Sequence, residues 1–254
     1  MAHSKAPDNH REREIALQFR LYQLQVAYHR QGLNAIIVLE GWDAAGKGGL
    51  IKRLTAELDP RFVAVEPIAA PDAIERTRHY MARFWDRLPA KGNWTVFDRS
   101  WYGRVLVERV EGFASKAEWS RAYAEINAME HAQVANGTRI IKLFLHISQA
   151  EQDERLINRL EAPWKRWKVG PDDFRNRSRR DAYLEAYEDM FAQCDTPHAR
   201  WHIIGANHKQ QARLEGLKII ADELAKAVDL TDPPLDPALR ELAEKELGVS
   251  LDPK

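Results

Sequence analysis

A glycine-rich segment between an apolar run and a helical segment constrains this chain more than any other feature. It reads Gly41-Trp42-Asp43-Ala44-Ala45-Gly46-Lys47-Gly48-Gly49 and follows the apolar run 35–39. Glycine at its first and sixth positions permits backbone conformations that other residues rarely adopt, and successive N–H groups then converge at a helix N-terminus, where an anion is favoured. A strand before and a helix after are the context that a phosphate-binding P-loop requires. We expect Lys47 to reach a transferring phosphoryl group and the loop residues Gly41, Ala44, Ala45, Gly46 and Gly48 to bind phosphate.

The loop departs from the common P-loop pattern at one position. Gly48 stands where Ser or Thr normally supplies a hydroxyl ligand to Mg²⁺. Asp43 is the natural replacement, because a carboxylate that faces polyanionic phosphate needs a cation. A second acid, Asp98, ends the apolar segment 94–98, and such an acid completes the metal site in P-loop enzymes. We therefore expect Mg²⁺ as cofactor, held by Asp43 and Asp98; the alternative is a glycine-rich turn without a ligand.

Apolar strand patterns alternate with helical patterns along most of the chain, which indicates an α/β protein with a parallel sheet. The expected strands cover residues 33–40, 62–66, 94–98, 139–147 and 201–204. The expected helices cover residues 12–30, 72–88, 116–136, 181–194 and 209–228, and a further helix runs from the glycine-rich loop to residue 58. A broad apolar face is expected on the first helix, formed by Ile15, Leu17, Phe19, Tyr22, Leu24, Val26 and Tyr28. Parallel crossovers place helices on both faces of the sheet, so we expect a three-layer α/β/α sandwich.

The composition excludes several classes of protein. The chain has 254 residues with 38 basic and 38 acidic side chains, so it lacks the excess positive charge that would indicate binding to nucleic acid or to an anionic membrane. No apolar run approaches the roughly 20 residues that cross a bilayer, and the first ten residues lack the apolar core of a secretory signal. The single cysteine, Cys194, fits a reducing compartment. We expect a cytoplasmic protein without membrane or nucleic-acid partners.

Positive charge is concentrated in one segment of this neutral chain. Between residues 155 and 180 the acids are Glu161, Asp172 and Asp173, and the basic residues are Arg155, Arg159, Lys165, Arg166, Lys168, Arg175, Arg177, Arg179 and Arg180. The segment follows the fourth expected strand, where P-loop kinases carry a lid that closes over phosphates. We expect Lys165, Arg166, Lys168 and Arg177 to bind a long anionic chain. The alternatives are a charged surface helix with ion pairs and single-stranded nucleic acid stacked on Trp164 and Trp167.

The segment after Asp98 combines arginines with aromatic residues. It reads Arg99-Ser100-Trp101-Tyr102-Gly103-Arg104. Arginines beside a metal site suit phosphate binding, and aromatic rings suit stacking on a base. We expect Arg99 to act in catalysis, Arg104 to bind phosphate, and Trp101 and Tyr102 to bind the nucleotide. Core packing is the alternative for the two aromatic side chains.

Three segments together resemble the polyphosphate kinase 2 family. They are the loop 41–48, the run Phe97-Asp98-Arg99-Ser100-Trp101-Tyr102-Gly103-Arg104, and the run Trp164-Lys165-Arg166-Trp167-Lys168. The resemblance covers about residues 10–228 and implies a P-loop kinase core with a helical lid, active as a phosphotransferase. It implies that Asp43 and Asp98 are the metal-binding and acceptor-activating acids, that Lys47 binds phosphate, and that Arg99 and the lid cations bind polyphosphate or nucleotide phosphates.

The chain is expected to divide into a kinase domain and a tail, and the resemblance sets the expected substrates and assembly. The kinase domain is expected over residues 1–230 with its lid at about 155–180, followed by a C-terminal linker and short helix over residues 231–254, and Asp236 before Pro237 is the expected cap of that helix. The expected reaction moves a phosphoryl group between inorganic polyphosphate and a nucleotide. The similarity of residues 98–104 to the AMP-phosphorylating branch favours AMP to ADP, while ADP to ATP and the guanine nucleotides GMP and GDP stay open. A homo-oligomer is expected, and the alternative function is an ATP-dependent kinase of the thymidylate-kinase-like type.

Overall fold

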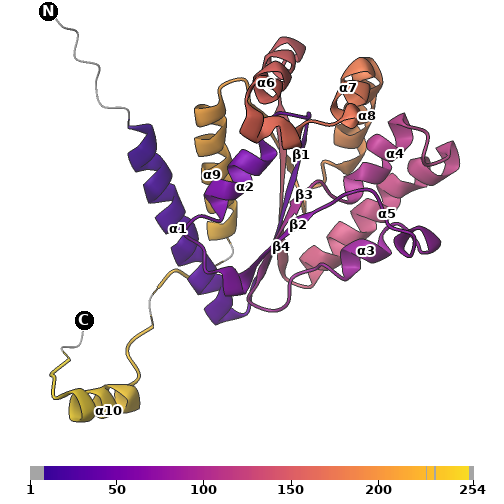
Figure 1. Ribbon diagram of the computed structural model, residues 1–254. Helices are drawn as coiled ribbons and strands as arrows, with labels where there is room; N and C mark the ends of the chain where they lie inside the picture. The colour runs from indigo at the N-terminus through magenta and orange to yellow at the C-terminus, as the bar shows by residue number, and fades with distance from the viewer. Residues whose placement is uncertain (1–8, 227, 232, 252–254) are drawn as a thin grey trace, which may run out of the picture.

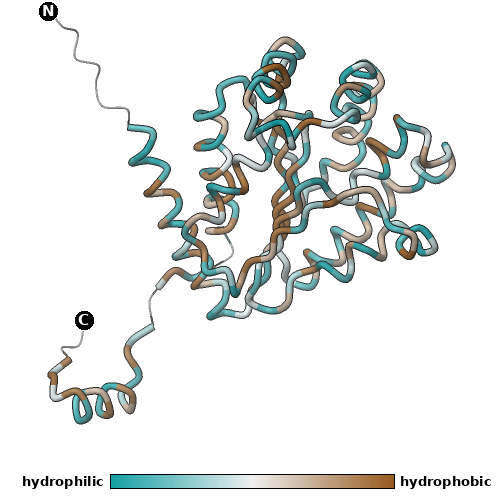
Figure 2. The backbone as a smooth tube through the Cα atoms, viewed as in Figure 1, coloured by the Kyte–Doolittle hydropathy of each residue, from teal (hydrophilic) through white to brown (hydrophobic). Residues whose placement is uncertain are grey.

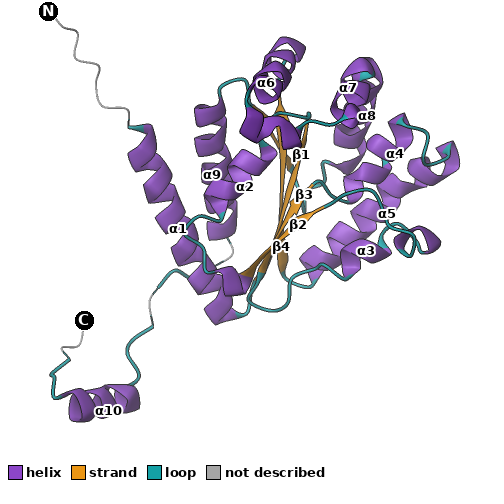
Figure 3. Cartoon of the chain, in the orientation of Figure 1, coloured by secondary structure: helices purple, strands orange, loops and turns teal. Residues whose placement is uncertain are grey.

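The computed structural model describes residues 9–226, 228–231 and 233–251. Its centre is a five-stranded sheet in the order β2-β3-β1-β4-β5, and every pairing is parallel. The strands are β1 (Asn34–Gly41), β2 (Val63–Pro67), β3 (Trp94–Asp98), β4 (Thr138–His146) and β5 (Trp201–Gly205). The expected five-stranded parallel sheet is therefore confirmed, and Figure 3 shows its strands edge-on between two groups of helices.

Helices cover both faces of the sheet, as the expected α/β/α sandwich requires. One layer holds α1 (His10–Gln31), α2 (Lys47–Leu54) and α9 (Lys209–Ala225), and the other holds α3 (Ala82–Trp85), α4 (Val107–Val110), α5 (Lys116–Ala135) and α8 (Arg180–Cys194) (Figure 1). Short 3₁₀ turns are η1 (Pro60–Phe62), η2 (Glu75–Thr77) and η3 (Trp101–Arg104). Figure 2 shows the most hydrophobic part of the chain running through the strands between the two layers.

The central strand β1 brings the glycine-rich loop to the carboxyl edge of the sheet. Its residues 35–39 are fully buried, which explains why the run is apolar on both faces of the strand. The register places Leu39 beside Asp98 of β3 and Gly41 beside Leu145 of β4. The loop, Asp98 and the segment after β4 therefore meet at one edge, where ligands bind in open parallel sheets.

Helix α1 differs from its expected single apolar face. Leu21, Leu24 and Tyr28 are buried against the domain, but another stripe of the same helix is open to solvent. This stripe consists of Ile15, Phe19, Tyr22 and Val26, with 55%, 59%, 40% and 41% of their surface exposed. The spacing of four, three and four residues places them along one side of the helix. Helix α1 thus has two apolar sides, and only one of them packs in this chain.

The helix expected over residues 72–88 is wrong. The segment forms only the short turns η2 and α3, because Arg78 adopts an extended backbone conformation between them. Asp72 caps the start of this segment, since its Oδ1 accepts hydrogen bonds from the N–H groups of Ile74 and Glu75. The cap therefore starts a turn that the next residues do not continue.

The segment after β4 rises over the carboxyl edge of the sheet as three short elements. These are α6 (Gln149–Glu161), η4 (Pro163–Lys168) and α7 (Pro171–Ser178), seen beyond the strand ends in Figure 1. Near the C-terminus, α10 (Pro237–Leu247) begins at its expected cap Asp236 and ends at Gly248. Within the described ranges, no helix combines the length and the apolar character needed to cross a membrane.

Candidate functional site

The glycine-rich loop adopts the backbone conformations that its sequence predicts. Gly41 and Gly46 have φ of 129° and 115°, and Ala44 joins them in the left-handed region with φ of 62°. An ideal Cβ on Gly41 would lie 2.2 Å from the carbonyl oxygen of Leu145, so a side chain does not fit there. Helix α2 begins at Lys47, directly after the loop. The loop N–H groups and the helix N-terminus thus form one electropositive concave surface.

Lys47 is buried beneath this loop. Its Nζ donates hydrogen bonds to the carbonyl oxygens of Gly41 at 2.7 Å and of Trp42 at 3.1 Å. Burial lowers the pKa of Lys47, and the negative charges of Asp43, Asp98 and Glu40 act in the opposite direction. An ammonium group beside three carboxylates is well placed to exchange its carbonyl contacts for phosphate oxygens.

Asp43 is the most constrained acid of the site. Its Oδ1 accepts a hydrogen bond from Arg99 Nη2 at 2.8 Å, and its Oδ2 accepts one from Asn176 Nδ2 at 2.8 Å. Burial raises the pKa of Asp43, but Lys47, Arg99 and the Asn176 hydrogen bond outweigh burial and leave that pKa lowered. The carboxylate is therefore held ionised and oriented by the loop, the turn after β3 and helix α7.

Asp98 and Arg99 form a sharp turn at the end of β3. Asp98 is half-buried, and its carbonyl oxygen accepts from Ile68 N–H at 3.0 Å. Arg99 has φ of 66°, a strained value for a residue with a side chain, and its N–H donates to the carbonyl oxygen of Leu39 at 3.0 Å. Strain of this kind concentrates at functional sites. The turn directs the half-exposed Arg99 side chain to Asp43.

The carboxylates of Asp43 and Asp98 fit a hard divalent cation. Mg²⁺ is bound in kinases by one or two carboxylates together with substrate phosphates and water. Among the described residues no group of three or more acids, histidines or cysteines is arranged to hold a metal by itself. A cation between these two acids would therefore depend on phosphate oxygens for its remaining ligands, as a substrate-borne metal does.

Arg155 supports the loop from below and was not singled out from the sequence. It is 3% exposed, and its Nη1 donates to the carbonyl oxygens of Ala44 at 3.0 Å and Ala45 at 2.8 Å. Its Nη2 donates to Ala206 at 2.6 Å and Asn207 at 3.1 Å. Arg155 therefore joins the loop to the segment after β5. Its position nearly two turns into the helix after β4 was the available signal, but Arg155 was interpreted only as part of a basic run.

The basic side chains of residues 155–180 fall into two groups, those that contact other parts of the protein and those that form no ion pair among the described residues. Arg180 lies over the Trp42 ring at 3.9 Å and donates to the carbonyl oxygen of Ile147. Arg177 pairs with Asp153 of α6, and Arg175 and Arg179 pair with Glu111. The exposed residues of η4 form no ion pair within the described part of the chain: Lys165, Arg166 and Lys168. The ion-pair alternative thus accounts for part of the segment, and η4 presents unneutralised charge.

The burial of Trp101 and Tyr102 contradicts the expectation that their rings stack on a base. Both side chains are 0% exposed and pack in the core between β3 and α5. The Arg104 guanidinium likewise contacts other side chains of the protein, because it pairs with Glu108 at 3.0 Å and lies over the Tyr80 ring at 4.4 Å. The core-packing alternative holds for the two aromatic residues.

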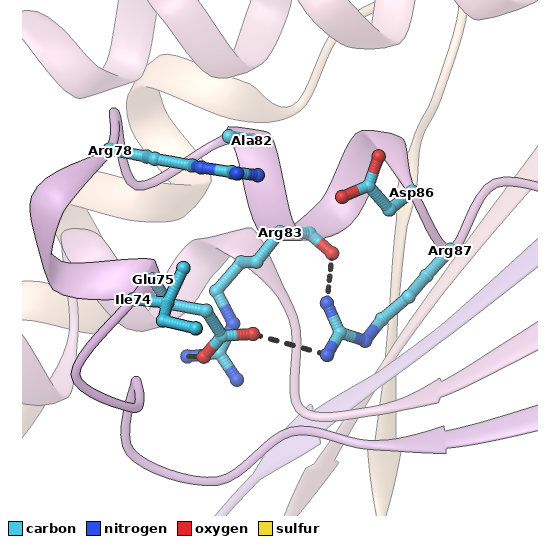
Figure 4. Close-up of a pocket in the computed structure, with 7 residues that line it drawn as sticks. All are labelled: Ile74, Glu75, Arg78, Ala82, Arg83, Asp86 and Arg87. Carbon is cyan, nitrogen blue, oxygen red and sulfur yellow. Dashed lines mark hydrogen bonds and ion pairs between the residues drawn. The ribbon is translucent and has the colours of Figure 1, made fainter.

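A surface pocket lies on the irregular segment between β2 and β3 (Figure 4). Within the pocket, Glu75 forms ion pairs with two arginines: its Oε1 lies 3.1 Å from Arg87 Nη2, and its Oε2 lies 3.4 Å from Arg83 Nη1. The full lining is Ile74, Glu75, Arg78, Ala82, Arg83, Asp86 and Arg87. Three arginines are thus opposed by two acids, and the pocket lacks the strongly cationic lining that a phosphate chain requires.

Known proteins are similar to this chain in sequence and in fold. The family model described as "Polyphosphate kinase 2 (PPK2)" matches residues 4–231. A polyphosphate:AMP phosphotransferase of Acinetobacter johnsonii is 51% identical over 75% of this chain, and the match covers 40% of that relative. ADP-polyphosphate phosphotransferase 2 of Rhizobium meliloti is 41% identical over 87% of this chain and is covered over 71% of its length. The chain thus spans about two fifths of the first of these relatives.

Two crystal structures agree with the same assignment. A putative polyphosphate kinase 2 from Pseudomonas aeruginosa PA01 superimposes with a TM-score of 0.84 at 43% identity, covering 89% of this chain and 48% of that one. Polyphosphate kinase 2 from Arthrobacter aurescens TC1 gives a TM-score of 0.88 at 33% identity, covering 96% of this chain and 88% of that one.

The parallel sheet with a glycine-rich loop after its central strand defines a P-loop protein. The chain belongs, within that class, to the polyphosphate kinase 2 family. The resemblance of its three motif segments is therefore confirmed at the level of the family.

Proposed function

We propose that this protein transfers a phosphoryl group between inorganic polyphosphate and a nucleoside mono- or diphosphate, with AMP to ADP as the favoured reaction. One observation carries the proposal: the buried Lys47 and the acids Asp43 and Asp98 gather at the loop, below a lid whose η4 cations are unneutralised. Family membership and the AMP phosphotransferase relatives support the donor and the acceptor. Diphosphate acceptors, including GDP, are the second substrate class, since several relatives are named for them.

The proposed transfer is an in-line attack by an acceptor phosphate oxygen on the terminal phosphorus of polyphosphate: a P–O bond to the acceptor forms, the P–O bond to the rest of the chain breaks, and the polyphosphate shortened by one phosphate leaves. Lys47 leaves its carbonyl partners and binds the transferring phosphoryl group, while the loop N–H groups bind the neighbouring phosphates. Arg99 leaves Asp43 and neutralises charge on the same oxygens. Lys165, Arg166 and Lys168 bind the rest of the chain and exclude water when the lid closes. Catalysis is thus positioning and electrostatic stabilisation.

The proposed cofactor is Mg²⁺, held by Asp43 and Asp98. A divalent cation held there would supply positive charge that stabilises the negative charge of the substrate phosphates. Asp43 remains ionised, because Lys47, Arg99 and the Asn176 hydrogen bond outweigh burial and lower its pKa. Gly48 supplies no hydroxyl, so Asp43 takes the position that Ser or Thr normally serves.

We also propose a homo-oligomer in the cytoplasm. The exposed stripe Ile15, Phe19, Tyr22 and Val26 of α1 supports self-association, because apolar side chains in a continuous row favour burial against another surface. The free thiol of Cys194 supports a reducing compartment. Light scattering on the native chain and on a Phe19→Glu variant tests the assembly, and a monomeric native chain would contradict it.

The deciding experiment supplies purified protein with Mg²⁺ and long-chain polyphosphate, without ATP, and measures nucleotide products from AMP and from ADP in separate reactions. ADP from AMP is the expected result. ATP formed only from ADP would retain the donor and overturn the preferred acceptor. If neither product forms, and ATP with a nucleoside or monophosphate acceptor restores transfer, the protein is an ATP-dependent kinase and the proposed donor is wrong.

A further inference from the structure

A buried ion pair lies directly behind the turn that carries Arg99. Lys142 of β4 and Glu130 of α5 are 0% and 1% exposed, and Lys142 Nζ lies 2.8 Å from Glu130 Oε2. Lys142 Nζ also donates to the hydroxyl of Tyr102 at 2.8 Å and to the carbonyl oxygen of Cys194 at 2.7 Å. All three donor hydrogens of the ammonium group are therefore used.

Glu130 completes the network from the other side. Its Oε1 accepts hydrogen bonds from Trp101 Nε1 at 3.0 Å and from the Tyr102 hydroxyl at 2.8 Å. The network thus joins one charge pair to the two side chains that follow Arg99 and Ser100. Burial raises the pKa of Tyr102, so its hydroxyl keeps the proton that it donates to Glu130.

Stability alone is a weak reason for such a pair. Removing two charges from water is costly, and apolar side chains of similar volume often pack in the same space without loss of stability. An ion pair instead adds conformational specificity, because its hydrogen bonds are satisfied in only one arrangement of the side chains. The arrangement specified here is that of Trp101 and Tyr102.

These two side chains hold a turn that carries strain. Ser100 Oγ donates to Glu40 Oε1 at 2.8 Å, and Tyr102 N–H donates to Ser100 Oγ at 3.3 Å. Arg99, one residue earlier, keeps its left-handed φ of 66° only while its neighbours are fixed. A turn released at Trp101 and Tyr102 would relax that backbone and displace both the Arg99 guanidinium and the Asp98 carboxylate.

We propose that Glu130 and Lys142 are positioning residues for the phosphoryl-transfer site: the buried pair anchors Trp101 and Tyr102 and thereby fixes Arg99 and Asp98 against Asp43. This inference rests on the proposed function for its kinetic consequence, but its structural consequence is independent of any activity. It also explains why the two aromatic residues belong to the motif 97–104 although neither is exposed to a ligand.

The test separates positioning from stability. Glu130→Leu removes both acceptors, whereas Glu130→Gln keeps an oxygen that accepts from Trp101 and Tyr102. Leu24→Ala, a buried substitution on α1, is the control for lost stability. We expect Glu130→Leu to reduce kcat by about 10- to 100-fold with little change in KM, because misplacement by about 1 Å has such an effect. Glu130→Gln is expected to recover most of that loss, and Leu24→Ala is expected to keep the native kcat.

Hydrogen exchange of the backbone amides 99–105 gives a readout without turnover. These amides donate in part within the turn, as Gly103 N–H does to the Ser100 carbonyl oxygen at 3.0 Å. We expect their exchange to accelerate in Glu130→Leu and in Lys142→Met, and to stay native in Leu24→Ala. Native exchange and native kcat in a folded Glu130→Leu variant would overturn the proposal. If the native protein transfers nothing from polyphosphate, the proposed function fails, and the exchange data still decide the positioning role.

Discussion

Asn176 of the lid helix α7 donates a hydrogen bond from Nδ2 to Oδ2 of Asp43 in the phosphate loop, at 2.8 Å and across 133 residues of sequence. The hydroxyl of Tyr183 donates in turn to Asn176 Oδ1 at 3.1 Å, so α8 holds the amide in the required orientation. The lid is therefore attached to the loop through a candidate metal-binding acid. The same hydrogen bond therefore attaches helix α7 to the loop and orients the Asp43 carboxylate.

Replacing Asn176 with Ala is expected to weaken closure and leave Asp43 less well oriented. A hydrogen bond to a charged group contributes about 1.5–3 kcal/mol, which corresponds to a loss of about 10- to 100-fold in kcat/KM. Steady-state kinetics with polyphosphate and AMP measures the effect. Ser178→Ala on the same helix is the matched control, because Ser178 is exposed and its hydroxyl contacts only the carbonyl oxygen of Arg175. Equal values of kcat/KM for the two variants would show that the hydrogen bond from Asn176 to Asp43 does not contribute to the reaction.

Gly41 is expected to tolerate no side chain. A Cβ there would lie 2.2 Å from the carbonyl oxygen and 2.8 Å from the nitrogen of Leu145, and the φ of 129° is one that L-residues rarely adopt. Overpacking and backbone strain together predict that Gly41→Ala lowers the free energy of unfolding by about 2–6 kcal/mol. Urea denaturation followed by circular dichroism measures this change.

Gly48 provides the contrast within the same loop. A Cβ at this position meets nothing within 4 Å, and its backbone needs no left-handed conformation. Gly48→Ala is therefore expected to keep the free energy of unfolding within about 1 kcal/mol of the native value. If Gly48→Ala lowered the free energy of unfolding as much as Gly41→Ala does, the close approach of β1 to β4 would not be the cause of the destabilisation in Gly41→Ala.

The exposed cations of η4 are expected to determine the affinity for polyphosphate. Replacing Lys165, Arg166 and Lys168 together with Ala removes three charges that carry no internal ion pair among the described residues. We expect KM for polyphosphate to rise by about tenfold or more, with a small change in kcat, because such charges attract a polyanion without touching the reacting atoms. The dependence of KM on salt concentration should also weaken.

A matched variant removes the same charge elsewhere. Lys91, Lys116 and Lys245 are exposed and lie on other segments of the chain. Their joint replacement with Ala is expected to leave KM for polyphosphate near the native value. A similar rise in KM for both triple variants would mean that overall charge, and not the lid, attracts the chain.

Much of the fold could be predicted from local patterns. The apolar run 35–39, the acid at Asp98 and the cap at Asp236 each depend on residues close in sequence, and each lies where the pattern indicated. The helix over 72–88 was wrong because Arg78 takes an extended conformation that no neighbouring residue predicts. The exposure of one apolar side of α1 was also missed, since apolar spacing alone does not say which side of a helix the domain covers.

The candidate site was predictable only in part, for the same reason. Lys47 and Asp43 belong to a contiguous motif, so their spacing identifies them. Arg155, Asn176 and Glu130 lie on separate helices, and their partners in the loop and in the turn after β3 lie 28 to 133 residues away. Trp101 was misread because an aromatic residue beside a metal site fits either a base or a core, and only burial decides between them.

His146 is expected to make stability depend on pH in the mildly acidic range. Its Nδ1 accepts a hydrogen bond from Trp42 Nε1 at 3.2 Å, so the folded protein favours a ring without a proton on that atom. Burial lowers the pKa of His146, and the positive charge of Arg180 adds to this effect. The unfolded chain therefore binds more protons below about pH 6.5. The stabilising contribution of neutral His146 is complete above that pH and is lost as the pH falls through the lowered folded pKa.

The variant His146→Asn isolates this contribution, because it removes the titrating ring from the edge of the phosphate loop. Urea denaturation of both proteins at pH 8 and at pH 5 gives two differences in the free energy of unfolding. We expect the native protein's advantage over the variant to be smaller at pH 5, since only the native protein must keep the partly desolvated imidazole neutral against protonation. An equal difference at both pH values would mean that protonation of His146 does not oppose folding and that the Trp42 contact survives with a charged ring.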